Sequence, residues 1–288
     1  MKTSIRSTIS CFAAILFGLH PAFLRADILY VANGSTDTIA KFASDGIGSV
    51  FASTADFPSG LAFDSAGNLY ASSLFGTVIE KFTPGGVGTV FATTGTSGNT
   101  GLAFDGAGNL FVANINSDTI HKITPQGVST VFVSTGLSNP TGLAFDLAGN
   151  LYVANASNNT IQRFDPSGSG SLFASTGVNG PFGLAFDMTG NLFVVNNGSN
   201  SIAKFTPDGI GSVFATSGLN NPVGLAFDSG GNLYSGNNGG IQSIIKFTPG
   251  GIGSVFATTG VNVPQFLAFT DDAGVPLKLP VVPEPATW

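Results

Sequence analysis

The stretch Gly142-Leu-Ala-Phe-Asp-Leu-Ala-Gly-Asn-Leu-Tyr-Val-Ala-Asn155 decides the fold of this chain. Its first five residues recur every 41 residues, and a sixth, altered copy, Phe266-Leu-Ala-Phe-Thr270, follows 42 residues after the fifth. The five full copies begin at Gly60, Gly101, Gly142, Gly183 and Gly224. Self-similarity at this period is typical of propellers and solenoids. We expect the one extra residue of the last period in the loop Asn237–Gln242.

Each period contains four short apolar runs separated by turn residues. In the third full copy the runs are Leu143–Phe145, Leu151–Ala154, Thr160–Phe164 and Ser171–Ala174. Asp, Asn, Pro and Gly between them favour tight turns, and runs of this length rich in β-branched and aromatic residues indicate strands. Four antiparallel strands in each repeat form the blade of a β-propeller.

The two ends of the repeat region complement each other. The segment from Ile28 to Asn33 matches the second strand of a repeat, whereas Leu267–Phe269 supplies only a first strand. Together they complete one blade, which leaves no open sheet edge at the point of closure. The sequence therefore predicts an all-β fold, a six-bladed β-propeller with four antiparallel strands per blade. One C-terminal strand joins three N-terminal strands to close the ring.

The repeat resembles the NHL repeat over residues 28–270. The resemblance rests on Gly-Leu-Ala-Phe-Asp-x-x-Gly-Asn-Leu-Tyr-Val-Ala-Asn, followed by Thr-Ile-x-Lys-Phe and Pro-x-Gly. It implies a propeller but no single activity, because NHL propellers include enzymes, RNA binders and protein-binding platforms.

Both ends of the chain carry sorting features. Lys2, Arg6 and an apolar run predict a secretory signal peptide at residues 1–26, and it contains Cys11, the one cysteine. The propeller is assigned to residues 27–272 and a Pro-rich tail to 273–288. In that tail Val282-Pro-Glu-Pro-Ala-Thr-Trp288 is similar to the start of the PEP-CTERM sorting signal. The resemblance implies a protein exported to the periplasm, outer surface or exterior of a Gram-negative-type bacterium. Membrane association is expected only through the hydrophobic anchor of that signal, which is missing after Trp288.

Charge and residue types limit the chemistry. Removal of Lys2, Arg6 and Arg25 with the signal peptide leaves 7 of the 10 basic side chains against 16 acidic ones, a net charge of −9. Phosphate binding needs a basic surface, so we expect no nucleic-acid partner. His121, the one histidine after the signal peptide, occupies a third-strand position that we interpret as exposed. We predict no catalytic residue, no metal ligand and no cofactor; Ca²⁺ is conceivable, but no residue pattern supports it.

Two recurring charged positions have structural explanations. The aspartate before each Gly-Asn turn is expected to accept backbone N–H groups of that turn, the alternative being a carboxylate ring that binds metal. The basic residue of each third strand is expected to cover apolar surface with its stem, the alternative being a cation ring for a polyanion.

Uncharged polar residues gather where the second-to-third-strand loops and the loops between blades meet on one face. Amide side chains there suit hydrogen bonding to sugars or to peptide backbone, although asparagine also tolerates turn conformations. Phenylalanines that depart from the repeat on this face are candidates for specificity. The candidate binding residues are Asn33, Asn114, Asn155, Asn196, Asn237, Phe57, Phe75 and Phe182.

The near-identity of the blades favours a non-enzymatic protein, because a catalytic site on a repeat fold usually interrupts the repeat. We expect an exported, monomeric binding or scaffold propeller of the cell envelope or extracellular matrix that recognises protein or polysaccharide through its loops. The alternative is a metal-dependent hydrolase of the lactonase or lyase type that uses the central channel. A purely structural envelope protein is a third interpretation that the sequence does not separate from the first.

Overall fold

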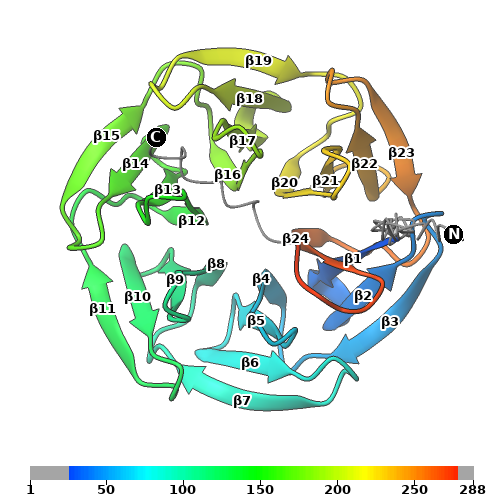
Figure 1. Ribbon diagram of the computed structural model, residues 1–288, viewed down its shortest axis with the longest axis horizontal. Helices are drawn as coiled ribbons and strands as arrows, with labels where there is room; N and C mark the ends of the chain where they lie inside the picture. The colour runs from blue at the N-terminus through cyan, green and yellow to red at the C-terminus, as the bar shows by residue number, and fades with distance from the viewer. Residues whose placement is uncertain (1–25, 278–288) are drawn as a thin grey trace, which may run out of the picture.

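The computed structural model describes residues 26–277, which form a closed ring of six four-stranded antiparallel sheets (Figure 1). This confirms the predicted six-bladed β-propeller. Helix in this part of the chain is limited to two short 3₁₀ turns, η1 (Gly34–Thr36) and η2 (Asn197–Ser199). None of its helices is long and apolar enough to cross a membrane. Nearly all of the predicted signal peptide and the whole Val282–Trp288 motif lie outside the described residues.

The blades are numbered in chain order, and their strands are given from the channel outward. Blade 1 contains β24 (Pro264–Asp271), β1 (Asp27–Asn33), β2 (Thr38–Phe42) and β3 (Gly48–Ser53); blade 2 contains β4 (Pro58–Phe63), β5 (Leu69–Ser73), β6 (Val78–Phe82) and β7 (Gly88–Thr93). Blade 3 contains β8 (Asn99–Phe104), β9 (Leu110–Asn114), β10 (Thr119–Ile123) and β11 (Ser129–Val133); blade 4 contains β12 (Pro140–Phe145), β13 (Leu151–Asn155), β14 (Thr160–Phe164) and β15 (Gly170–Ala174). Blade 5 contains β16 (Pro181–Phe186), β17 (Leu192–Asn196), β18 (Ser201–Phe205) and β19 (Gly211–Ala215); blade 6 contains β20 (Pro222–Phe227), β21 (Leu233–Asn237), β22 (Ser243–Phe247) and β23 (Gly253–Ala257).

Blade 1 closes the ring as the sequence predicts. Its inner strand β24 comes from the end of the propeller and pairs antiparallel with β1, with Leu29 opposite Phe269. The chain then turns back, so that Pro276 pairs with Thr270 and the Leu277 N–H donates to the Phe269 carbonyl at 3.3 Å. Because the first and last strands share one sheet, the ring has no open edge at its seam.

The inner strands begin earlier than predicted. In blade 4 the strand starts at Pro140 rather than at Leu143, and its pairing with β13 is irregular between those two residues. The apolar pattern missed Thr141, which is only 2% exposed and donates its hydroxyl to the Pro181 carbonyl of the next blade at 3.0 Å. The extra residue of the last period does lie between β21 and β22, in the segment 238–242.

An aromatic triad occupies each of the six blade interfaces. The second-strand aromatic residue meets a phenylalanine of its own outer strand and a phenylalanine of the next blade's inner strand, edge to face, with ring centroids 4.9–5.1 Å apart. The inner-strand phenylalanines that recur at this position therefore pack between blades: Phe63, Phe104, Phe145, Phe186, Phe227 and Phe269. The triads are Tyr30–Phe51–Phe63, Tyr70–Phe91–Phe104, Phe111–Phe132–Phe145, Tyr152–Phe173–Phe186, Phe193–Phe214–Phe227 and Tyr234–Phe256–Phe269.

Glycine allows the inner strands to approach one another around the channel. A Cβ atom on Gly142 would lie 2.1 Å from the Phe182 carbonyl oxygen, and one on Gly101 would lie 2.3 Å from the Thr141 carbonyl oxygen. Both obstacles are backbone atoms, which a side-chain rotation cannot move. The recurring glycine of the Gly-Leu-Ala-Phe-Asp phrase therefore sets the spacing of neighbouring blades.

Removing one aromatic ring tests the triads. We expect Tyr152→Ala to lower the free energy of unfolding by about 3–5 kcal/mol, because it leaves a cavity between blades 4 and 5. Tyr152→Phe is the matched control, since blades 3 and 5 carry Phe111 and Phe193 at this position, and it should unfold close to the wild type. Chemical denaturation monitored by circular dichroism measures the free energy of unfolding of both variants. An equal loss in the two variants would show that the hydroxyl, and not the ring packing, stabilises the interface.

Candidate functional site

The antiparallel blades give the disc two different faces. One face, here called the loop face, carries the connections between second and third strands and the connections between blades. The opposite face, here called the turn face, carries the Asp-Gly-Asn turns and the turns between third and outer strands. The polar groups of the turn face recur in nearly every blade.

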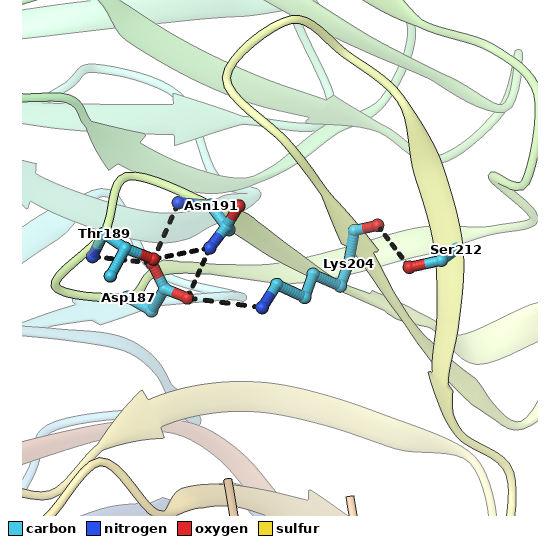
Figure 2. Close-up of polar contacts among 5 residues, drawn as sticks. All are labelled: Asp187, Thr189, Asn191, Lys204 and Ser212. Carbon is cyan, nitrogen blue, oxygen red and sulfur yellow. Dashed lines mark hydrogen bonds and ion pairs between the residues drawn. The ribbon is translucent and has the colours of Figure 1, made fainter. Parts of the chain in front are cut away.

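The turn-face aspartates are held by their own turns, which confirms the turn-capping interpretation. Asp187 Oδ1 accepts the backbone N–H groups of Thr189 and Asn191, both at 2.9 Å, and Oδ2 accepts the Asn191 side-chain amide at 2.8 Å (Figure 2). The bonds from the asparagine recur in all five blades with this turn, at Asp64, Asp105, Asp146, Asp187 and Asp228. Hydrogen bonds from N–H groups stabilise the charged carboxylate and occupy its oxygens.

The third-strand lysines pair with these carboxylates. The Nζ of Lys204 lies 3.7 Å from Asp187 Oδ2 (Figure 2) and 5.2 Å from the centroid of the Phe193 ring. Lys81, Lys122 and Lys246 make the same two contacts in their blades. The lysine ammonium groups therefore lie beside aromatic rings and are balanced by the turn aspartates, and the covering of apolar surface by the stems stays a prediction. These side chains belong to the structural repeat of the turn face.

The turn carboxylates make stability depend on pH. Burial raises the pKa of Asp187, but the hydrogen bonds from Asn191 and Thr189 together outweigh it, so the pKa lies below its usual value; the pKa of Asp64 is lowered in the same way. A lowered folded-state pKa adds stability above the unfolded pKa of about 3.9 and loses it as pH falls through the folded value.

We expect Asp187→Asn to lose about 1–3 kcal/mol at pH 6, since hydrogen bonds to a charged acceptor are lost. The deficit should shrink at pH 3, below the unfolded pKa of about 3.9, because the unfolded wild type then binds a proton that folding must release. Urea denaturation of both proteins at the two pH values measures it. An equal deficit at both values would contradict a role for the carboxylate charge.

The candidate asparagines at the loop face are buried and hydrogen-bonded within the chain. Asn155 Nδ2 donates to the Gly136 carbonyl at 3.0 Å, and its Oδ1 accepts the Ser138 N–H at 3.2 Å. Asn33, Asn196 and Asn237 make the same pair of bonds to the loop that precedes their inner strand. Asn114 instead donates to the Thr96 hydroxyl at 2.9 Å. These amides hold the loop face together, and their contact with a ligand stays a prediction.

Two of the three candidate phenylalanines lie together. The rings of Phe57 and Phe75 meet at 5.1 Å and 61°, and Phe75 is 66% exposed. Phe57 reaches across to blade 1, where a Cβ atom on Gly34 would lie 2.3 Å from its Cζ. Phe182 lies elsewhere, half-buried against the core between blades 5 and 6. Phe57 and Phe75 therefore form a partly exposed aromatic pair between blades 1 and 2, Phe182 belongs to a different interface, and ligand contact by all three stays a prediction.

A groove of about 610 Å³ opens between blades 4 and 5. One wall comes from β15 and the loop that follows it. The other wall comes from β18 and β19, which are neighbouring strands of blade 5 (Figure 1). The groove reaches the loop face at Asn179 and Ser199. Asn196, one of the predicted candidates, is among its lining residues.

The lining of this groove contains no charged side chain. Its polar groups are amides and hydroxyls, including the exposed Ser175, Thr176 and Ser199. Its apolar surface comes from residues such as Leu172 and Val213. A mixed surface of this kind suits an uncharged ligand that offers both hydrogen-bonding groups and apolar faces, such as a peptide segment or a neutral sugar.

The third-strand position that we interpreted as exposed is buried in several blades, and in blade 5 its residue, Ala203, lines the groove. His121 is 8% exposed, and Ala203 and Ile245 are 5% and 4% exposed at the equivalent position. The interpretation was wrong because this strand face looks into the cleft between blades rather than outward. His121 Nδ1 lies 3.1 Å from the Ser129 hydroxyl, and burial lowers its pKa. Ala203 is shorter than Gln162 and His121 at this position, but blade 1 carries the equally short Ala40, so the repeat alignment does not by itself locate the groove.

The alternative metal-dependent function would need a cluster of ligands. Within residues 26–277, no group of three or more His, Cys, Asp or Glu side chains is arranged to hold a metal ion.

Comparison of the sequence with protein families and with curated proteins finds no match. Solved structures share the fold. A chain of a nidogen–laminin complex is 22% identical, with a TM-score of 0.76 over 84% of this chain and 98% of that one. Virginiamycin B lyase from Staphylococcus aureus is 19% identical, with a TM-score of 0.66 over 85% and 88%. A gluconolactonase from Xanthomonas campestris is 21% identical, with a TM-score of 0.66 over 83% and 88%. At these identities the similarity establishes the six-bladed propeller and leaves the function open.

Proposed function

We propose that this chain is a non-enzymatic binding propeller that holds an uncharged ligand, a protein segment or a glycan, in the groove between blades 4 and 5. The observation that carries the proposal is the lining of the groove, which combines hydroxyls, amides and aliphatic side chains with no charge. The groove opens to the loop face, where we predict recognition from the sequence.

The fold alone does not select this function, because its structural neighbours include both a chain of a protein complex and enzymes. The resemblance of the repeats to NHL repeats supports a binding platform to the same limited extent. The chemistry of the groove favours binding: it provides several hydrogen-bonding groups and a concave apolar surface, which together orient a neutral ligand.

Filling the groove tests the proposal. We expect Ala203→Gln to abolish binding of glycans or peptides identified by array screening of the purified protein, since the longer side chain enters the groove. Blade 4 already carries Gln162 at this position, so the fold should accept it. Isothermal titration calorimetry with the array hits measures the affinity.

The matched control is Ala40→Gln, the same change between blades 6 and 1, which should bind like the wild type. Equal loss of binding in both variants, or binding unchanged by Ala203→Gln, would overturn the assignment to this groove. If no glycan or peptide on the arrays bound the protein and the protein hydrolysed a lactone, the binding function itself would be overturned.

We further propose export to the bacterial cell envelope or extracellular matrix, supported by the signal-peptide pattern of residues 1–26 and by the PEP-CTERM-like Val282–Trp288. The full chain produced in a Gram-negative host should appear in the periplasm or medium with residues 1–26 removed, as mass spectrometry would show. Replacing the apolar run with polar residues should retain it in the cytoplasm. Accumulation of the unprocessed wild-type chain in the cytoplasm would contradict export.

A further inference from the structure

A second pocket, of about 230 Å³, opens on the turn face between blades 4 and 5. Its lining contains the aromatic triad of this interface, Tyr152–Phe173–Phe186, and the turn aspartates of both blades, Asp146 and Asp187. The pocket is smaller than the roughly 300–1,000 Å³ of pockets that enclose drug-sized molecules. Its size therefore suits a single projecting side chain.

Four other blades show what a site of this composition binds. In blades 2, 3, 5 and 6 the third-strand lysine places its ammonium group 3.5–3.8 Å from Oδ2 of the turn aspartate and 5.2–5.4 Å from the centroid of the second-strand ring. In blade 5 the two partners of the lysine are Asp187, as Figure 2 shows, and Phe193. Their counterparts in blade 4 are Asp146 and Tyr152, which both line the pocket. The pocket therefore contains the two groups that hold a lysine elsewhere in the ring.

Blade 4 carries an arginine in place of that lysine. Within the described residues, Arg163 makes neither the ion pair nor the ring contact, and it is exposed and does not line the pocket. It still acts on the Tyr152 hydroxyl, because burial and Asp146 raise the pKa of that group and a hydrogen bond with Arg163 partly offsets them. The Asp146 carboxylate keeps its hydrogen bonds from Ala148 and Asn150. The blade 4 site is thus built like the others but lacks the lysine.

The turns beside this site also depart from the repeat. The residue after the turn aspartate is serine or glycine in blades 2, 3 and 6, whereas blades 4 and 5 carry Leu147 and Met188. Both side chains line the pocket, and they are 56% and 57% exposed. Exposed apolar groups that gather at one place commonly mark a contact with a partner. Together with the carboxylate, they suit a basic side chain whose neighbours are apolar.

We propose that this pocket is a docking site for a lysine side chain of a partner polypeptide that carries apolar residues beside the lysine. The ammonium group lies against Asp146 Oδ2 and the Tyr152 ring, where the other blades hold their own lysine. The apolar neighbours of that lysine contact Leu147 and Met188. The net charge of −6 favours the approach of a basic segment. The site adjoins the uncharged groove, since Phe173 lines both, but it takes a charged group.

Met188 gives a direct readout of this site, because it is one of two methionines in the chain and the other is Met1. The test titrates protein labelled with ¹³C-methyl methionine with the peptide acetyl-Gly-Leu-Lys-Leu-Gly-amide and follows the Met188 methyl signal by NMR. We expect the signal to shift with millimolar affinity, since a partly exposed ion pair is weak. The same peptide with glutamine in place of lysine should need about fivefold or higher concentration. No shift of the signal, or equal affinity for the two peptides, would overturn the proposal.

Variants of blade 4 test the composition of the site. Asp146→Asn removes the charge, and Arg163→Lys supplies the lysine that other blades carry, so each should weaken binding of the lysine peptide about fivefold. Arg163→Ala keeps the site open and should bind at least as tightly as the wild type. The matched control Asp105→Asn makes the same turn change in blade 3 and should leave binding unchanged, and circular dichroism checks that every variant is folded.

Unchanged binding in Asp146→Asn or Arg163→Lys would contradict the proposed site. An equal loss of binding in Asp105→Asn or Arg163→Ala would contradict it as well, because the effect would then not depend on an open lysine site in blade 4. Binding in the groove is measured with other ligands and with Ala203→Gln, so failure here leaves the proposed function standing.

Discussion

Aromatic packing across the blade interfaces is the interaction on which the rest of this structure depends. Each second-strand tyrosine or phenylalanine contacts a phenylalanine of the next blade, and the last of these contacts joins Tyr234 to Phe269 of the closing blade. Edge-to-face pairs of this kind contribute about 0.5–1.5 kcal/mol each beyond the burial of their surface. Since every blade uses the same contact, the interfaces are alike and the ring closes with six of them.

Because every blade repeats the same contacts, most recurring polar groups already have hydrogen-bond or ion-pair partners within the chain. The aspartate of each Gly-Asn turn is occupied by backbone and asparagine N–H groups, and the third-strand lysine lies against it and over an aromatic ring. On the other face, the buried asparagines hold the loops between blades. A residue that performs a structural task in five or six blades has its hydrogen bonds supplied by its own blade or the preceding one.

Departures from the repeat lie at particular blade interfaces. The groove lined by Ala203 lies between blades 4 and 5, although blade 1 carries the equally short Ala40 at the same third-strand position. Phe57 and Phe75 form an exposed pair because the loops around them depart from the repeat.

Much of the fold was predictable from the sequence because the same repeat occurs six times. The 41-residue period, the turn residues and the split blade determined the six blades, their strand order and the closure by β24, and the turn role of residues such as Asp187 followed from its place before Gly-Asn. Only the tertiary structure decided which strand faces look into the clefts between blades. His121 and Ala203 share one strand position, and its variability was interpreted as exposure, yet the neighbouring blade buries it. The burial of Asn155 and the exposure of Val213 could not be predicted from the sequence either. Both depend on the distance between adjacent sheets, which the sequence of a single repeat does not determine.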